Sequence, residues 1–445
     1  MTVAAASPRG VRLNHLDFAV LALYWVAIGY LWQSLGVLIL PDAVREIVGS
    51  ARQGTALSVL EGIGTVVALV WQPVAGTMSD RTRTRWGRRR PFIFTGTVGD
   101  VLFLIGLALS GSFWPLVVFY TLLQLASNTA QGPYQGLAPD VVPEGQRGTA
   151  SGFYGLANLL GILAGTLVAG QIQSQAGRPA ALMSIALFLV VTMLVTVLFV
   201  PERRDLPSAR VGSPLKLLLV TFGTPLRYPP FLWLMGSRLL ILMGIVGIQS
   251  FVFFYFADVF FHGDSRATTN ATKGLAGLVV VLAILVTWPA ARLSDRIGRK
   301  PMVVIGGVVA AAGMLILLFS GYRWLPDAVV APIASLLALP ELAAQTLAAG
   351  VLIGIGFGSF FSVDWAFITD VIPTSDQAGL FFGFSNIATA GSGVIARFTS
   401  GPLLDHFNAG PHILNLPGGY PVIFGIFFVW LILGTLLILP VRVNR

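Results

Sequence analysis

Residues 79–93 read SDRTRTRWGRRRPFI, and residues 294–301 read SDRIGRKP. Both segments begin with Ser-Asp-Arg and run through glycine and basic residues to a proline, and each lies between two apolar runs. Further along, residues 139–143 (PDVVP) and 369–373 (TDVIP) repeat in the same order. A short motif that recurs at the same place in two series of apolar runs indicates two related halves of one membrane protein.

The composition also favours a lipid bilayer. Of the 445 residues, 55% are hydrophobic and 11% are charged, against about 25% charged residues in soluble domains. Cysteine is absent, which excludes disulfides and thiol chemistry, and the four scattered histidines argue against a metal site. No phosphate-binding loop, catalytic triad or nucleotide fingerprint appears. We therefore expect a protein that is not an enzyme, with no catalytic residues and no bound cofactor or metal.

Twelve apolar runs are long enough to cross a bilayer as helices. The predicted spans are 17–40, 54–77, 91–110, 114–137, 148–170, 178–200, 229–256, 272–292, 301–320, 346–372, 378–402 and 419–439. The proline-interrupted segment 321–345 predicts an external loop with a short interfacial helix. The fold class expected is an all-α membrane protein with twelve transmembrane helices in two six-helix pseudo-repeats. Its expected parts are an N-terminal tail (1–16), a first half (17–200), a linker (201–228), a second half (229–439) and a C-terminal tail (440–445).

The basic residues give the orientation. Most of the 28 Lys and Arg residues fall in loops on the same side as the N-terminus, which predicts that both termini are cytoplasmic. This topology accounts for the net charge of +9, so no nucleic-acid partner is expected. We expect a multi-pass monomer in the cell (inner) membrane whose partners are the lipid bilayer, a small-molecule solute and a coupling cation.

The repeated loop resembles the signature of the major facilitator superfamily, Gly-x-x-x-Asp-Arg-x-Gly-Arg-Arg/Lys. The second copy matches almost directly, and the first has an insertion before Gly87. The extension through Pro91 to Ile93, and the segment LQLASNTAQGPYQGLAPD at 123–140, are similar to the sucrose/proton symporters, which are related to the glycoside-cation symporters. The resemblance implies a two-half transporter of a sugar or glycoside. One departure is Gln124, which stands where the plant carriers have an aspartate, because an amide carries no proton near neutral pH.

Few ionisable residues lie inside the predicted spans, where each costs at least about 2.5–3.5 kcal/mol to insert. The helical rise puts Arg238 of span seven and Asp364 of span ten at similar depths, and the resemblance implies that both spans line the central cavity. Asp364 is therefore a candidate coupling carboxylate with Arg238 as its partner. A fixed buried ion pair, or an Arg238 side chain that snorkels to the interface, are the alternatives. Glu61 and Asp100 are further coupling candidates.

The repeated loop also predicts a cytoplasmic latch between the halves, because its aspartates lie at helix ends beside arginines. Topology charges alone are the alternative explanation. Glu61 and Arg397 lie at similar depths in spans two and eleven. The resemblance implies that these two spans meet across the halves, so the pair is a candidate external gate, or else a static interface pair. The candidate gating residues are Asp80, Arg81, Arg88, Asp295, Arg296, Arg299, Glu61 and Arg397.

Uncharged polar side chains in the spans are candidates for a sugar site. Gln124, Asn128 and Gln131 share one helix face because they are spaced by four and three residues. Hydrogen bonding between helices is the alternative role for each. The candidate substrate-binding residues are Gln33, Gln124, Asn128, Gln131, Gln249, Trp365 and Asn386.

These features predict a secondary transporter of a small polar solute, a sugar or glycoside, that works by alternating access coupled to a proton or sodium ion. An exporter of amphipathic compounds on the same fold is a second hypothesis, favoured by 30 Phe and 10 Trp residues. A non-transporting receptor or assembly factor is a third.

Overall fold

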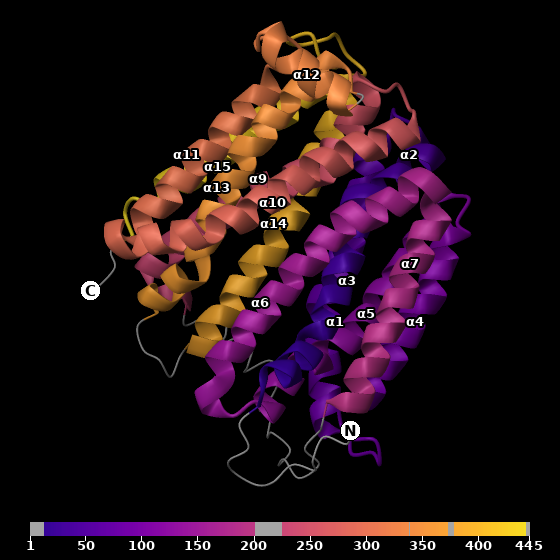
Figure 1. Ribbon diagram of the computed structural model, residues 1–445, viewed down its shortest axis with the longest axis vertical. Coiled ribbons are helices and arrows are strands. Elements are labelled where there is room, and N and C mark those ends of the chain that lie inside the picture. Colours follow the sequence, from indigo (N-terminus) through magenta and orange to yellow (C-terminus); the bar gives the residue numbers. More distant parts are fainter. Residues whose placement is uncertain (1–12, 201–224, 338, 373–377, 442–445) are drawn as a thin grey trace. The chain divides into compact units, whose positions relative to one another are not determined.

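The computed structural model describes residues 13–200, 225–337, 339–372 and 378–441, and these residues form helices without a strand (Figure 1). The predicted linker and both predicted tails lie mostly outside the described residues. In chain order the helices are α1 (His15–Ser34), η1 (Leu35–Ile39), α2 (Leu40–Val48), α3 (Gln53–Arg81), α4 (Arg90–Ala108), α5 (Phe113–Val141), η2 (Glu144–Gln146), α6 (Arg147–Ala164), η3 (Gly165–Ala169), α7 (Gly170–Phe199), η4 (Pro225–Arg227), α9 (Pro229–Val259), α10 (Ser265–Ile297), α11 (Arg299–Leu318), α12 (Asp327–Leu337), α13 (Glu341–Val371), α14 (Ala378–Asn408) and α15 (Gly419–Leu437).

Nine stretches of the described chain are long and apolar enough to cross a membrane. One of them, Arg147–Phe199, is 53 residues long and holds two predicted spans, because Gly177 breaks it with a φ of 83° that favours glycine. The fourth and eleventh predicted spans coincide with α5 and α14. Each of the twelve predicted spans therefore corresponds to helical structure, and the predicted all-α membrane fold is confirmed. The short helix α12 lies where the sequence predicted one.

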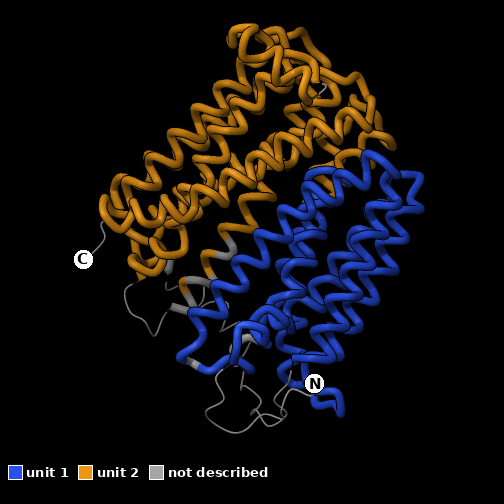
Figure 2. The backbone as a smooth tube through the Cα atoms, viewed as in Figure 1, with its two compact units in different colours: residues 1–39, 63–210 blue, residues 40–62, 211–445 orange. Residues whose placement is uncertain are grey.

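The chain forms two compact units, drawn in blue and orange in Figure 2. The first comprises residues 1–39 and 63–210, and the second comprises residues 40–62 and 211–445. In the first unit α4 packs against α5 and α7, and α1 packs against α6 and α7. In the second unit α13 packs against α10 and α11, and α9 packs against α14 and α15. The second unit thus includes α2 and the first turns of α3; the predicted boundaries of the halves stay predictions.

Glycine allows the closest of these contacts between α11 and α13. A Cβ atom on Gly356 would lie 2.6 Å from the backbone oxygen of Gly306 and 2.6 Å from the backbone nitrogen of Ala310. A larger residue cannot enter this contact without moving the backbone, so the two helices are held in one register. This packing fixes where α13 carries Asp364.

Candidate functional site

A buried ion pair joins α9, α13 and α14 in the second unit. Nε of Arg238 donates to both carboxyl oxygens of Asp364, at 2.8 and 3.0 Å. Nη1 of Arg238 donates to the backbone oxygen of Ser385 at 2.8 Å and to Oγ1 of Thr389 at 2.6 Å. The two charged side chains are 6% and 4% exposed, and each has its opposite charge in contact. The two residues predicted to share a level are therefore in direct contact, as a well-satisfied pair.

A second polar network surrounds Asp258, at the C-terminal end of α9. Its carboxyl group accepts hydrogen bonds from the Arg45 guanidinium of α2, from Nε2 of Gln53 at 2.6 Å and from the Tyr420 hydroxyl of α15. Arg45 also donates to Oε1 of Gln53 at 2.8 Å. This network binds segment 40–62 to α9 and α15, at the end of the helices that the topology predicts to be external.

The first turn of α3 is bound to α14. Both oxygens of Asp405 accept backbone N–H groups, from Gly54 at 2.9 Å and from Thr55 at 2.7 Å. These N–H groups lack partners inside a helix, and the positive end of the helix dipole adds to their attraction for a carboxylate. Asp405 therefore caps α3 from a distant part of the sequence.

The predicted Glu61–Arg397 contact extends the same interface by about two helical turns. The Arg397 guanidinium pairs with Glu61 and also donates to Oγ of Ser250 on α9 at 3.0 Å. Ser58 of α3 donates to the backbone oxygen of Arg397 at 2.6 Å. The gating role of Glu61 and Arg397 stays a prediction, but both residues belong to one continuous α3–α14 contact.

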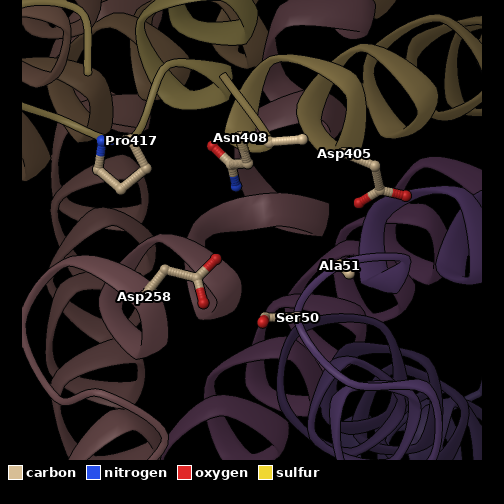
Figure 3. A pocket seen from close by; sticks show the side chains of 7 residues that line it. Ser50, Ala51, Asp258, Asp405, Asn408 and Pro417 are labelled. Carbon is tan, nitrogen blue, oxygen red and sulfur yellow. The ribbon is translucent and has the colours of Figure 1, made fainter. Parts of the chain in front are cut away.

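A cavity of about 270 Å³ lies beside these contacts. Figure 3 shows the carboxyl groups of Asp258 and Asp405 on its wall, with the Asn408 amide directed between them. The cavity does not adjoin the Arg238–Asp364 pair. Both aspartates already accept the hydrogen bonds described above. The cavity is therefore a space beside the α3–α14 contact and is not assigned a binding role.

The two repeated loops form related ion-pair clusters. In the first unit, Arg89 donates to Asp140 at 2.6 Å and to Asp80 at 2.8 Å, and Arg88 binds the other oxygen of Asp140 at 2.6 Å. In the second unit, Arg299 binds Asp370 at 2.9 Å. Asp140 and Asp370 belong to the repeated PDVVP and TDVIP motifs, so each unit joins its basic loop to the same later position.

The two clusters differ in burial, which predicts a difference in stability. Asp140→Asn is expected to cost about 1–3 kcal/mol, because Arg89 and Asp140 are only 7% and 9% exposed. Asp370→Asn is the matched control and is expected to cost less than about 1 kcal/mol, because Arg299 and Asp370 are 32% and 33% exposed. Thermal unfolding in detergent measures both, and an equal fall in the two midpoints would contradict the prediction.

Buried amides form a polar run on α5 in the first unit. Nε2 of Gln124 donates to the Tyr120 hydroxyl at 2.9 Å, and Nδ2 of Asn128 donates to the backbone oxygen of Gln124 at 2.8 Å. Both amide side chains are buried, and they share one face of the helix. On α1, Nε2 of Gln33 donates to Oγ1 of Thr166 at 3.1 Å. Hydroxyl and amide groups of this kind can bind the hydroxyl groups of a polar solute.

Comparison with known proteins places these features in a family. Residues 50–440 match the family described as MFS/sugar transport protein, which covers most of the chain. The chain belongs to this family. It is thus a transporter of the major facilitator superfamily and not an enzyme.

Several transporters are similar in sequence to this MFS protein. It is 22% identical to sucrose transport protein SUT1 of Oryza sativa subsp. japonica over 435 residues, which covers 83% of this chain and 79% of the relative. It is 24% identical to sucrose transport protein SUT5 of Oryza sativa subsp. indica over 440 residues, with the same coverage of 83% and 79%. It is also 25% identical to tetracycline resistance protein, class B, of Escherichia coli over 290 residues, 64% of this chain and 69% of the relative.

Solved structures of other transporters share the fold. Nucleoside transporter NupG superposes with a TM-score of 0.66 at 13% identity, covering 97% of this chain and 100% of NupG. A bacterial homologue of the human lysosomal transporter Spinster, solved inward-facing and unoccupied, also gives a TM-score of 0.66, at 14% identity with 95% coverage of both chains. At these identities the likeness concerns the fold alone.

Some predicted site residues of this MFS transporter do not come together. Asp295 and Arg296 are exposed, and no ion pair of theirs is found among the described residues; Arg81 is exposed as well. Trp365 points outward with 57% exposure. Gln131 and Gln249 are half-buried. The side chain of Asn386 lies outside the described residues.

Sequence analysis missed the residues that bind segment 40–62 and the Arg89–Asp140 pair. Asp258 and Asp140 lie at span ends, where a charge costs little to insert into the membrane. The insertion cost therefore does not single them out. A signal was present for Asp140, because it is the aspartate of a motif that repeats with Asp370. No comparable repeat marks Arg45, Gln53 or Asp405.

Proposed function

We propose that this MFS transporter moves a small polar solute, a sugar or glycoside, by cation-coupled secondary transport through alternating access. The observation that carries the proposal is the buried Tyr120–Gln124–Asn128 run, whose two amides lie in the segment that resembles the sucrose symporters. The names of the rice relatives agree with such a substrate. The proposal includes a monomer in the cell membrane with both termini cytoplasmic.

Uptake of a panel of radiolabelled sugars into proteoliposomes tests this function. Uptake that responds to an imposed pH or sodium gradient is expected for at least one sugar or glycoside. Gln124→Ala is expected to lower that uptake by up to about tenfold at limiting solute, since one neutral hydrogen bond contributes about 0.5–1.5 kcal/mol. Asn270→Ala removes an exposed amide instead and is expected to leave uptake unchanged.

Export of an amphipathic compound is a second candidate function, because of the similarity to the tetracycline resistance protein. Extrusion of a hydrophobic dye without uptake of any sugar would replace the first proposal with this one. Absence of flux for every sugar and dye would instead favour a receptor or assembly role.

A further inference from the structure

Asp100 is an ionisable residue of α4 that takes no part in the contacts described so far. It lies near the middle of α4, about 15 Å from Arg90 and about 12 Å from Ala108 by helical rise. Its side chain is 0% exposed, and neither carboxyl oxygen has a hydrogen-bond partner among the described residues. By contrast, Asp364 in the second unit has an arginine in contact. An isolated carboxylate is strongly disfavoured in such surroundings and takes up a proton.

Close helix packing keeps Asp100 dry. A Cβ atom on Gly96 would lie 2.6 Å from the backbone oxygen of Ala126, and one on Gly99 would lie 2.8 Å from Cβ of Ala126. Helices α4 and α5 are therefore in close contact over the turn that precedes Asp100. With this packing beside it and no exposed surface of its own, the Asp100 carboxyl group is shielded from solvent.

Tyr24 of α1 bonds to α4 close to Asp100 in the sequence, and its hydroxyl hydrogen is already used. The hydroxyl of Tyr24 lies 2.7 Å from Oγ1 of Thr97, one turn before Asp100 on α4. Thr97 donates its own hydrogen to the backbone oxygen of Ile93 at 2.8 Å, so the Tyr24 hydroxyl is the donor to Thr97. Tyr24 then has only acceptor capacity left, which fits a neutral carboxylic acid and not a carboxylate.

Other ionisable groups on the packed helices do not supply a counter-charge. The Tyr134 ring of α5 lies edge-on to Tyr24 with 5.0 Å between centroids. The remaining ionisable residues of α5 and α7 are Tyr120, Asp140 and Arg178. Among the described residues, Asp100 therefore has neither an ion pair nor a hydrogen bond.

We propose that Asp100 is the proton-binding site of this transporter, and that it holds the coupling proton in the conformation described here. The proposal deepens the proposed function, since it names the coupling cation as a proton. In a second conformation, water or a cationic side chain reaches Asp100, and the carboxyl group releases its proton. The group thus alternates between a buried protonated acid and a solvated or ion-paired carboxylate.

Infrared spectroscopy of the reconstituted protein tests the proton site without any substrate. At neutral pH the wild type is expected to show the carbonyl stretching band of a protonated carboxyl group, and Asp100→Asn is expected to remove it. Glu61→Gln is the matched control and is expected to leave the band unchanged, since Glu61 is buried but paired with Arg397. A wild type without such a band, or a band that survives in Asp100→Asn, would overturn the site.

Transport measurements test the carrier role. A pH gradient is expected to drive accumulation in the wild type, whereas Asp100→Asn should reach only equal concentrations inside and outside while retaining solute exchange, because the amide mimics the protonated acid. Accumulation driven by a sodium gradient at symmetric pH would overturn the role of Asp100 as carrier. If no sugar is transported by the wild type but the Asp100-dependent band is present, the proposed substrate fails and the proton site stands.

Discussion

Asp364→Asn is expected to lower the folded yield sharply, with a stability loss of about 3–5 kcal/mol. The reason is that the substitution leaves the Arg238 guanidinium buried without its opposite charge, although the bonds to Ser385 and Thr389 remain. Fluorescence-detected size exclusion and thermal unfolding in detergent measure this loss. Asp327→Asn is the control, because Asp327 is 76% exposed and its pair with Arg323 contributes little.

The double variant Asp364→Asn with Arg238→Gln distinguishes a structural pair from a coupling site. Removing both charges removes the uncompensated cation, so folded yield is expected to recover. If Asp364 only pairs with Arg238, gradient-driven uptake recovers as well, and coupling then belongs to another carboxyl group. Recovered yield together with exchange that no longer responds to a gradient would show instead that Asp364 is the coupling residue.

Asp258→Asn is expected to release segment 40–62 from α9 and α15, and so expose the α3–α14 contact. The Arg45 guanidinium then loses its opposite charge, and the bonds from Gln53 and Tyr420 are weakened. Hydrogen bonds to a charged group contribute about 1.5–3 kcal/mol each, and 1.4 kcal/mol is a tenfold change in an equilibrium constant. We therefore expect at least about a tenfold rise in the population in which this contact is open.

Cysteine labelling measures that opening, because the chain contains no cysteine of its own. Ser58→Cys places a thiol at a position of α3 that is 1% exposed and bonded to Arg397. Its reaction with a membrane-impermeant maleimide is expected to be at least about tenfold faster in Asp258→Asn than in the parent. An equal rate in the two proteins would mean that the Asp258 network does not hold the segment.

The spans and one buried pair were predictable because single residues and local runs determine them. A run of about 20 apolar residues specifies a span, and the helical rise alone puts Arg238 and Asp364 at one level. The contact between those two residues also needs the arrangement of α9 and α13, which the family resemblance supplied.

The Asp258 and Asp405 contacts were not predictable in this way. Asp258 and Arg45 are separated by 213 positions, and the bond between Asp405 and Thr55 joins residues 350 positions apart. Both aspartates lie at helix ends, where water or many other groups can satisfy a charge. The isolation of Asp100 was equally hidden, because it depends on which face of α4 meets α5.

The bonds from Gly54 and Thr55 to Asp405 have a consequence for biogenesis. The ribosome synthesises the first turn of α3 long before residue 405. These two N–H groups therefore lack their acceptor until Asp405 has been synthesised and α14 has packed. Until α14 arrives, the start of α3 is free to fray or to bind water and lipid headgroups. The N-terminal part of the chain thus enters the membrane before the start of α3 is capped, and α14, one of the last helices to be synthesised, completes it.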